Sequence, residues 1–435
     1  MKRKITILAL TIILALSVFA FSSCFLIPDE IQFELNEDGE SYYVSNIRSG
    51  VKVADIPAEY EGKPVTAIGE NAGEYAHSSL KELIIPEGVT SIGKGAFKGC
   101  SNLEKIVIPS TLTSTGEIAF YFEYYGKNPS SSPEIHLADP ESYIKGEHAS
   151  VPKGKFYSNG ELITSLEIDS SSKSLFGNSQ ITDVVIKSDL SKIPDKMFSL
   201  FTSLKGVVIE EGVKEIGYHS FYGCSALEEV ILPNGLEIIG SGAFEKCSML
   251  KKITIPQSLE RIGANAFYYA GEGAYEQTGK NLQVHISSIE NWCGISFEFE
   301  GNPCFYDLYL NGSVVTTLDL SGVEKISWHA FESCYSITNV IIGDKVTEIG
   351  YNSFYNCNAL ESVIIGANVT YIGHGAFSSC EALESVTFKS TSGKWHYMYG
   401  ESKTGILFEL GTPEENAELF KGSSLADHNI KKYKD

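Results

Sequence analysis

The chain has 435 residues, and its 34 Lys and Arg against 55 Asp and Glu give a formal net charge of −21 at pH 7. A surface this acidic repels polyanions, so the charge argues against nucleic acid and anionic lipid headgroups as partners. In a chain of this length, internal repeats are the first feature to examine, because a regular period sets the fold.

The N-terminus has the features of a targeting segment. Basic residues precede a largely apolar run over residues 5–20, which is too short for an ordinary membrane span. The run ends in Phe21-Ser-Ser-Cys24, and small residues before a cysteine resemble the bacterial lipobox, in which the cysteine is acylated. We expect a signal peptide over residues 1–23 and lipid attachment at Cys24. A secreted protein without a lipid, or an uncleaved anchor, is the alternative. No later run reaches membrane length, so membrane contact is expected through the lipid only.

Residues 24–65 contain strand-like stretches at 42–44 and 56–65 but no full repeat. A repeat array needs an end that shields its first coil from water. We therefore expect a linker and an N-terminal cap over residues 24–65.

A repeat begins after this segment. One unit is Ile92-Gly93-x-x-Ala96-Phe97-x-x-Cys100-x-x-Leu103-x-x-Ile106-x-Ile108-Pro109. The same frame recurs at intervals of 23 residues from Ile216, Ile239 and Ile262, and again from Ile326, Ile349 and Ile372, with degenerate copies from Ile68, Thr115 and Ile193. Each unit predicts a short strand, with alternate apolar residues on one side, and a turn or helical return segment. The glycine is expected to permit a tight bend.

One such coil cannot bury its inner face alone, whereas stacked coils share a continuous core. The frame resembles the BspA-type branch of the leucine-rich repeat superfamily over roughly residues 40 to 390. The resemblance implies a leucine-rich-repeat solenoid of α/β-type repeats that is mostly β. We expect repeats over residues 66–390, with a single parallel β-ladder and short turn or helical return segments.

Two stretches, residues 121–192 and 271–317, interrupt the period. Tyr157-Ser-Asn159-Gly160 in the first matches Tyr309-Leu-Asn311-Gly312 in the second, and Asn-Gly between alternating apolar residues predicts a β-hairpin. Residues 391–435 lose the repeat and are expected to form a C-terminal cap. Trp395 could shield the last coil, and Gly411-Thr-Pro413-Glu-Glu-Asn416-Ala resembles the closing segment of this family.

Most cysteines occupy one slot of the repeat. Phe201 fills the same slot in its own unit, so the site accepts a purely apolar group, and we expect buried free thiols there. The cysteines of this column are Cys100, Cys224, Cys247, Cys334, Cys357 and Cys380. Cys293 and Cys304 lie outside the frame; a disulfide between them and two unlinked thiols both remain open.

The sequence contains no motif for a catalytic nucleophile, a phosphate loop or a metal site. His219, His329 and His374 lie on different coils, so we expect them to face solvent rather than to bind a metal. The carboxylates are scattered through variable slots. No catalytic residue, cofactor or metal site is therefore expected.

The exposed side of the strands is the candidate binding face. One outward column is largely β-branched, and its neighbour is mixed polar. The β-branched column is Ile84, Val107, Val208, Ile231, Thr254, Ile341, Ile364 and Thr387. The polar column is Glu82, Lys105, Gly206, Glu229, Lys252, Asn339, Ser362 and Ser385. These columns either reflect β-propensity alone or form a shallow ligand surface.

Export, a lipid anchor and a repeat scaffold favour a cell-surface protein that binds a protein or glycan partner. Because a fold does not determine function, this step rests on resemblance. Two alternatives remain. One is an exported enzyme with its site in the irregular coils, and the other is a structural envelope protein without a specific ligand.

Overall fold

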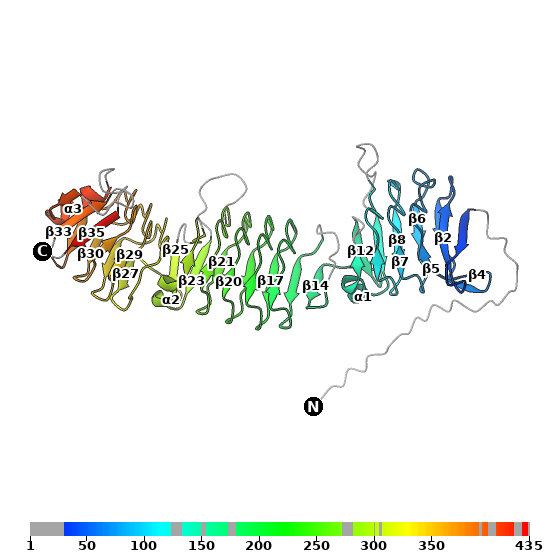
Figure 1. Ribbon diagram of the computed structural model, residues 1–435, viewed down its shortest axis with the longest axis horizontal. Coiled ribbons are helices and arrows are strands. Elements are labelled where there is room, and N and C mark those ends of the chain that lie inside the picture. Colours follow the sequence, from blue (N-terminus) through cyan, green and yellow to red (C-terminus); the bar gives the residue numbers. More distant parts are fainter. Residues whose placement is uncertain are drawn as a thin grey trace, which may run out of the picture.

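The computed structural model describes residues 30–122, 133–148, 154–172, 180–271, 282–299, 301–303, 307–390, 394–398, 406–421 and 429–433. Within these residues the chain forms an elongated stack of coils, with its strands side by side along one axis (Figure 1). In this part of the chain, no helix has the length and hydropathy that crossing a membrane requires. The expected signal peptide, Cys24 and Cys304 lie outside the described residues.

The longer strands form a parallel ladder, here called the main ladder, in three sections. The first section contains β3 (Val53–Asp55), β6 (Glu82–Ile84), β8 (Lys105–Ile108), β10 (Glu134–Leu137) and β12 (Lys155–Ser158). The second contains β14 (Ser165–Ile168), β15 (Asp183–Ile186), β17 (Gly206–Ile209), β19 (Glu229–Ile231), β21 (Lys252–Thr254), β23 (Gln283–Ile286) and β25 (Asp307–Leu310). The third contains β27 (Thr317–Leu320), β28 (Asn339–Ile342), β30 (Ser362–Ile365) and β32 (Ser385–Phe388). The predicted solenoid is confirmed.

The return segments contribute a second ladder, here called the turn ladder. Its strands have two residues each: β7 (Ser91–Ile92), β9 (Ser114–Thr115), β11 (Glu147–His148), β16 (Lys192–Ile193), β18 (Glu215–Ile216), β20 (Ile238–Ile239), β22 (Arg261–Ile262), β24 (Ser296–Phe297), β29 (Glu348–Ile349) and β31 (Tyr371–Ile372). The expectation of a single ladder is therefore wrong. Stacking brings the backbone at each repeat's first isoleucine into register with the next coil, so these short segments pair as well.

The glycine after that isoleucine has a different role from the one expected. A Cβ at Gly93 would lie 2.6 Å from the backbone nitrogen of Glu70, and one at Gly240 would lie 2.8 Å from the carbonyl oxygen of Ile216. Glycine is thus required by the close approach of neighbouring coils. The positive φ that a bend requires falls two residues later, for example 64° at Gly95 and 61° at Gly242.

Both predicted hairpins are present. Asn159 and Gly160 have φ of 51° and 82°, and Asn311 and Gly312 have 50° and 85°, as a two-residue hairpin with a type I′ turn requires. The return strands β13 (Glu161–Leu162) and β26 (Ser313–Val314) pair antiparallel with β12 and β25. Because each return strand occupies the free edge of its ladder section, the next coil starts a new section.

Side chains bridge the first section boundary. The Oε1 atom of Gln180 accepts from the backbone N–H of Phe156 at 2.7 Å, and its Nε2 atom donates to the carbonyl oxygens of Phe156 and Ile163. At the second boundary Ser336 occupies the equivalent position, and its Oγ accepts from the backbone N–H of Leu308 at 3.4 Å. These contacts replace backbone pairing that the hairpins interrupt.

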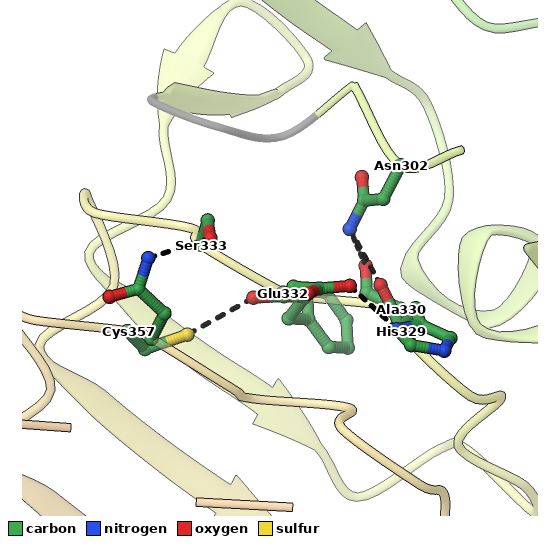
Figure 2. A network of polar contacts seen from close by, with 8 residues as sticks. Asn302, His329, Ala330, Glu332, Ser333 and Cys357 are labelled. Atoms are coloured by element: carbon green, nitrogen blue, oxygen red, sulfur yellow. Dashed lines mark hydrogen bonds and ion pairs between the residues drawn. The ribbon is translucent and has the colours of Figure 1, made fainter. Parts of the chain in front are cut away.

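At the second boundary, additional hydrogen bonds form on the side of the turn ladder (Figure 2). Asn302 Nδ2 donates to the carbonyl oxygens of His329 and Ala330, at 2.7 and 3.0 Å. The indole Nε1 of Trp292 donates to the same Ala330 oxygen at 2.7 Å. Both side chains are buried, so these bonds form in a setting where an unpaired polar group would be costly.

The core runs along the whole stack between the two ladders. Leu, Val and Ile from the main ladder meet the phenylalanines of the regular return segments, while α1 and α2 contribute Tyr143 and Trp292 instead. The phenylalanine rings stack along the axis: Phe221 and Phe244 lie 5.3 Å apart with planes 2° from parallel, and Phe354 and Phe377 lie 5.2 Å apart at 4°. Within each run of regular coils, the repeated sequence slot thus becomes an aromatic column.

The cysteine column lies beside these rings. The Sγ atoms of Cys224, Cys247, Cys357 and Cys380 each donate to the carbonyl oxygen of the phenylalanine in the preceding coil, at 3.0–3.2 Å. Burial raises the pKa of the Cys224 thiol to about 12. The cysteines of the column are buried, as predicted. The slot therefore uses cysteine as a small hydrophobic residue that also satisfies a buried carbonyl.

We predict that Cys224, Cys247, Cys334, Cys357 and Cys380 remain free thiols in the exported protein. Burial raises the pKa of the Cys224, Cys247 and Cys357 thiols, and equivalent side chains in stacked coils point in the same direction rather than at each other. Peptide mapping of alkylated, unreduced protein checks this. A linked Cys224–Cys247 or Cys357–Cys380 peptide in quantity would contradict it.

Among its described residues, each irregular stretch contains one short helix. The helices are α1 (Pro140–Lys145) and α2 (Ile289–Gly294). Asp139 and Ser288 cap them: the Asp139 side chain accepts from the backbone N–H of Glu141, and the Ser288 hydroxyl accepts from that of Asn291. The two stretches are therefore structural duplicates, with a capped helical turn followed by a hairpin.

Both ends of the stack are covered. At the N-terminal end, β1 (Ile31–Leu35) pairs antiparallel with β2 (Tyr42–Ile47), which runs beside β5 (Lys63–Ile68); β4 (Glu59–Tyr60) also pairs with β5. At the C-terminal end lie β33 (Lys394–Met398), β34 (Ile406–Phe408), β35 (Asn429–Tyr433) and α3 (Pro413–Lys421). Trp395 is buried against Phe388, as expected, and Asn416 Nδ2 donates to the Val386 carbonyl oxygen at 3.1 Å.

Candidate binding face

The two predicted columns point outward from the main ladder. Val208 is 40% exposed and Ile231 is 51% exposed, while their strand neighbours Val207 and Val230 are buried. The remaining members of both columns are exposed or half-buried, and none is buried. The alternation of the strands thus places these side chains on one accessible face.

Strand register extends the β-branched column through the irregular coils. In the first section the column reads Asp55, Ile84, Val107, His136 and Tyr157. In the second it reads Glu167, Val185, Val208, Ile231, Thr254, His285 and Tyr309. In the third it reads Asp319, Ile341, Ile364 and Thr387. We call this the central column.

A groove opens over the middle of the second section. It has a volume of about 580 Å³, and Ile231 and Thr254 line it together with Glu229 and Lys252. This volume is within the range of small-ligand sites, which combine an apolar surface with a few polar groups. Four residues predicted from the sequence are therefore brought together in one hollow.

The polar column balances its own charges across neighbouring strands. Glu82 lies opposite Lys105, which lies opposite Glu134, and Glu229 lies opposite Lys252. Opposite charges in these positions stabilise a strand pair modestly. Although the whole chain has a net charge of −21, its charges alternate locally along this column. The face is suited to a partner without strong net charge.

Sequence reasoning missed four aromatic side chains of the central column. The rings of His136 and Tyr157 stack at 5.1 Å between centroids, and those of His285 and Tyr309 stack at 4.6 Å. Tyr157 and Tyr309 were aligned through the Asn-Gly turns, but the column was traced only through regular repeats. Extending the alignment back to Glu134-Ile-His136 and Gln283-Val-His285 would have found the pairs.

One histidine departs from the expectation of a solvent-facing side chain. His329 is only 7% exposed, and its Nδ1 lies 2.6 Å from Glu332 Oε2 (Figure 2). Its backbone φ is 60°, and its ring lies edge-on to Tyr351. The Glu332 carboxylate and the Tyr351 ring of the next coil cover the imidazole, and the repeat slot alone does not reveal these contacts. His219 and His374 are half-buried, and each stacks on a tyrosine.

Among the described residues, no three His, Cys, Asp or Glu side chains are grouped as a metal site would require. A second hollow of about 490 Å³ lies beside α1 in the first irregular stretch, where Ser142 and Lys145 line it. The Ser142 hydroxyl donates to Asp139 Oδ2 at 2.6 Å, so it serves the helix cap.

Burial, with a smaller contribution from Lys252, lowers the pKa of His285, which keeps this ring uncharged near neutral pH.

The chain is similar in sequence and in fold to known bacterial proteins. A sequence profile of the family described as BspA type Leucine rich repeat region matches in six copies, over residues 66–128, 156–290 and 301–403. A leucine-rich repeat protein from Bacteroides ovatus is 23% identical, with 83% of this chain and 93% of that chain covered and a TM-score of 0.54. This likeness shows a shared fold. No curated protein matches the chain.

Two other solved structures are similar over most of their length. A leucine rich cell surface protein from Faecalibacterium prausnitzii is 20% identical, with 83% of this chain and 94% of that chain covered and a TM-score of 0.34. The pneumococcal vaccine antigen PcpA is 18% identical, with 83% and 80% covered and a TM-score of 0.32. These TM-scores are too low to support an argument about this chain.

Proposed function

The chain belongs to the BspA-type leucine-rich repeat family, and from this premise we propose that it is an exported protein, lipid-anchored at Cys24, that binds a protein or glycan through its main ladder. Proteins of this family are typically found at the cell surface, are often involved in adhesion and are typically not enzymes. The proposal assigns no catalytic residue and no cofactor to this chain.

The observation that carries the proposal is the groove over Ile231. An exposed isoleucine with Glu229 and Lys252 beside it offers both apolar contact and hydrogen-bonding groups. The central column continues this surface along the stack, and a long regular scaffold suits an extended contact. A structural envelope protein without a ligand would not require such a hollow.

We predict that Ile231→Glu weakens partner binding by the mature chain, residues 24–435, at least tenfold without unfolding it. A charge at the floor of the groove would be desolvated by a bound partner, which is unfavourable. Solid-phase binding to matrix proteins and to a glycan array measures the effect. Met249→Glu is the matched control, because Met249 is 48% exposed on a neighbouring coil but lies outside the face. Equal binding by both variants would contradict the proposal.

The anchor has its own test. We predict that Cys24→Ser abolishes fatty-acid incorporation and releases the protein from the membrane fraction, because the acylated thiol would be absent. Metabolic labelling with a fatty acid and fractionation of the cells measure both effects. If the wild-type protein incorporates no fatty acid, Cys24 is not the anchor.

A further inference from the structure

The central column repeats one order of residue types in successive sections. Each section begins with an acidic side chain, namely Asp55, Glu167 or Asp319. β-Branched side chains follow. The first two sections then end in a histidine and a tyrosine on adjacent strands, whereas the third ends at Thr387 beside the cap. The aromatic pair thus occurs twice, at the same place in the first and second sections.

The two pairs have nearly the same geometry. The ring planes lie 15° from parallel in His136–Tyr157 and 14° in His285–Tyr309. Each histidine Nε2 contacts the side chain two residues earlier on its own strand: Glu134 at 3.5 Å in the first pair and Gln283 at 3.3 Å in the second. All four rings are half-buried. Recurrence of one arrangement on two strand pairs is evidence for a built feature rather than a chance contact.

Each pair closes one end of the β-branched surface. His136 follows Val107 in the column, and His285 follows Thr254. Since side chains stand roughly perpendicular to a sheet, the longer rings rise above these shorter neighbours. In the second section Thr254 lines the groove, and His285 lies opposite Thr254 on the next strand, so the ring stands beside the groove rather than in its lining. On the other side of each tyrosine lie the exposed hairpin residues Leu162 and Val314.

We propose that the two His–Tyr pairs are twin subsites for a neutral polysaccharide that lies along the main ladder. This inference rests on the proposed function and specifies the class of partner. A sugar has an apolar C–H face that packs against rings and aliphatic side chains, and hydroxyl groups that pair with amides, carboxylates and phenols. The half-buried rings and the β-branched floor supply the first kind of contact, and Gln283 and Asp307 supply polar groups beside the second pair.

The charges around the pairs favour a neutral chain. Glu134 contacts His136 and lies between Lys105 and Lys155, and Gln283 lies between Lys252 and Asp307. The charges beside each pair nearly cancel, so they give an anionic polymer no local attraction that offsets repulsion by the net charge of −21. A neutral glycan meets no such repulsion, and the carboxylates then act as acceptors for its hydroxyl groups.

Duplication favours a polymer over a single compact partner. The two pairs are separated by most of the second section, on the order of 30 Å at about 4.8 Å per strand. A repeating chain can occupy both subsites at once, and the second contact is then intramolecular, so the two together hold more strongly than either alone. A folded protein partner would need matching features at the same separation.

The test uses the mature chain and four variants: His285→Leu, His136→Leu, the double variant, and His219→Leu as the control. His219 also stacks on a tyrosine, Tyr218, but lies in a return segment outside the main ladder. Leucine approximates the size of imidazole and removes the ring. Affinity electrophoresis and calorimetry measure binding to soluble β-glucan, α-mannan and galactomannan, with hyaluronan as the anionic comparison. Thermal unfolding of each variant confirms that it is folded. If a leucine variant unfolds, Tyr309→Leu or Tyr157→Leu tests the same pair.

We expect the wild type to bind at least one neutral polysaccharide and not hyaluronan. Each single variant should bind about tenfold more weakly, the double variant should lose at least a hundredfold through loss of avidity, and His219→Leu should bind as the wild type does. Absence of binding to every neutral polysaccharide overturns the inference. So does glycan binding that the leucine variants leave unchanged. Binding to a matrix protein alone, weakened by Ile231→Glu, would overturn this inference while sustaining the proposed function.

Discussion

Replacing Phe244 by alanine is expected to lower the free energy of unfolding by about 3–5 kcal/mol, as for other fully buried phenylalanines. Phe244 is 0% exposed, and its ring lies 5.3 Å from both Phe221 and Phe267. The truncation leaves a cavity in the middle of the aromatic column, and neighbouring coils on both sides hold the backbone apart. The site therefore has little freedom to collapse.

Chemical denaturation measures this loss, and hydrogen exchange over residues 216–262 locates it. Met249→Ala, at an exposed position close to Phe244 in sequence, is the matched control and should change stability by less than about 0.5 kcal/mol. A loss below about 1 kcal/mol for Phe244→Ala would mean that the stacked column contributes little to the core.

The regular part of the fold could be predicted because each repeat slot has one physical role. Phe97, Phe244 and Phe354 fill equivalent slots and are all buried, as the pattern requires. The Asn-Gly hairpins were equally predictable, since both residues must adopt positive φ and few other dipeptides do so readily. In these cases the conformation or burial that the residue type favours is the one that the stacked coils require.

The turn ladder could not be predicted in the same way. A segment such as Lys192-Ile193 has only two residues, too few to show an alternating pattern. Its pairing with Glu215-Ile216 arises from stacking of whole coils rather than from strand propensity. The role of Gly93 is also non-local, because the atoms that exclude a side chain there belong to the preceding coil.

Only part of the candidate site could be predicted from the sequence, for a related reason. Outward residues such as Ile231 and Lys252 follow from the alternation of a regular strand. His136 and His285 lie on strands that precede irregular helical turns, where the period gives no register. Their place in the central column is set by pairing with β8 and β21. The positions of these two histidines therefore follow from strand pairing in the irregular coils and not from the 23-residue period.

The irregular coils also divide the stack mechanically. At the first boundary the antiparallel strand β13 occupies the edge of β12, so no main-ladder backbone bonds continue from β12 into β14. The side chain of Gln180 makes the connection through Phe156 and Ile163. In a repeat protein, stability is the sum of unit and interface contributions, so a weak interface lets neighbouring blocks unfold separately.

Gln180→Leu is the second change with a large expected effect. It removes the acceptor of the Phe156 N–H at a buried position, at a cost of about 1–3 kcal/mol, and also removes the donor to the half-buried Ile163 carbonyl. We expect the N-terminal section to unfold first, so that one transition becomes two. Calorimetry combined with hydrogen exchange over residues 42–158 and 181–286 separates the two blocks.

Gln257→Leu is the control, because Gln257 is exposed and makes no bond across a section boundary. It should leave a single transition near the wild-type temperature. If Gln180→Leu also unfolds in one transition with unchanged stability, the apolar contacts across the boundary alone hold the sections together. If it unfolds in two, the amide of Gln180 couples the section that contains His136 to the section that contains His285, and a partner that spans both subsites would then stabilise the boundary it crosses.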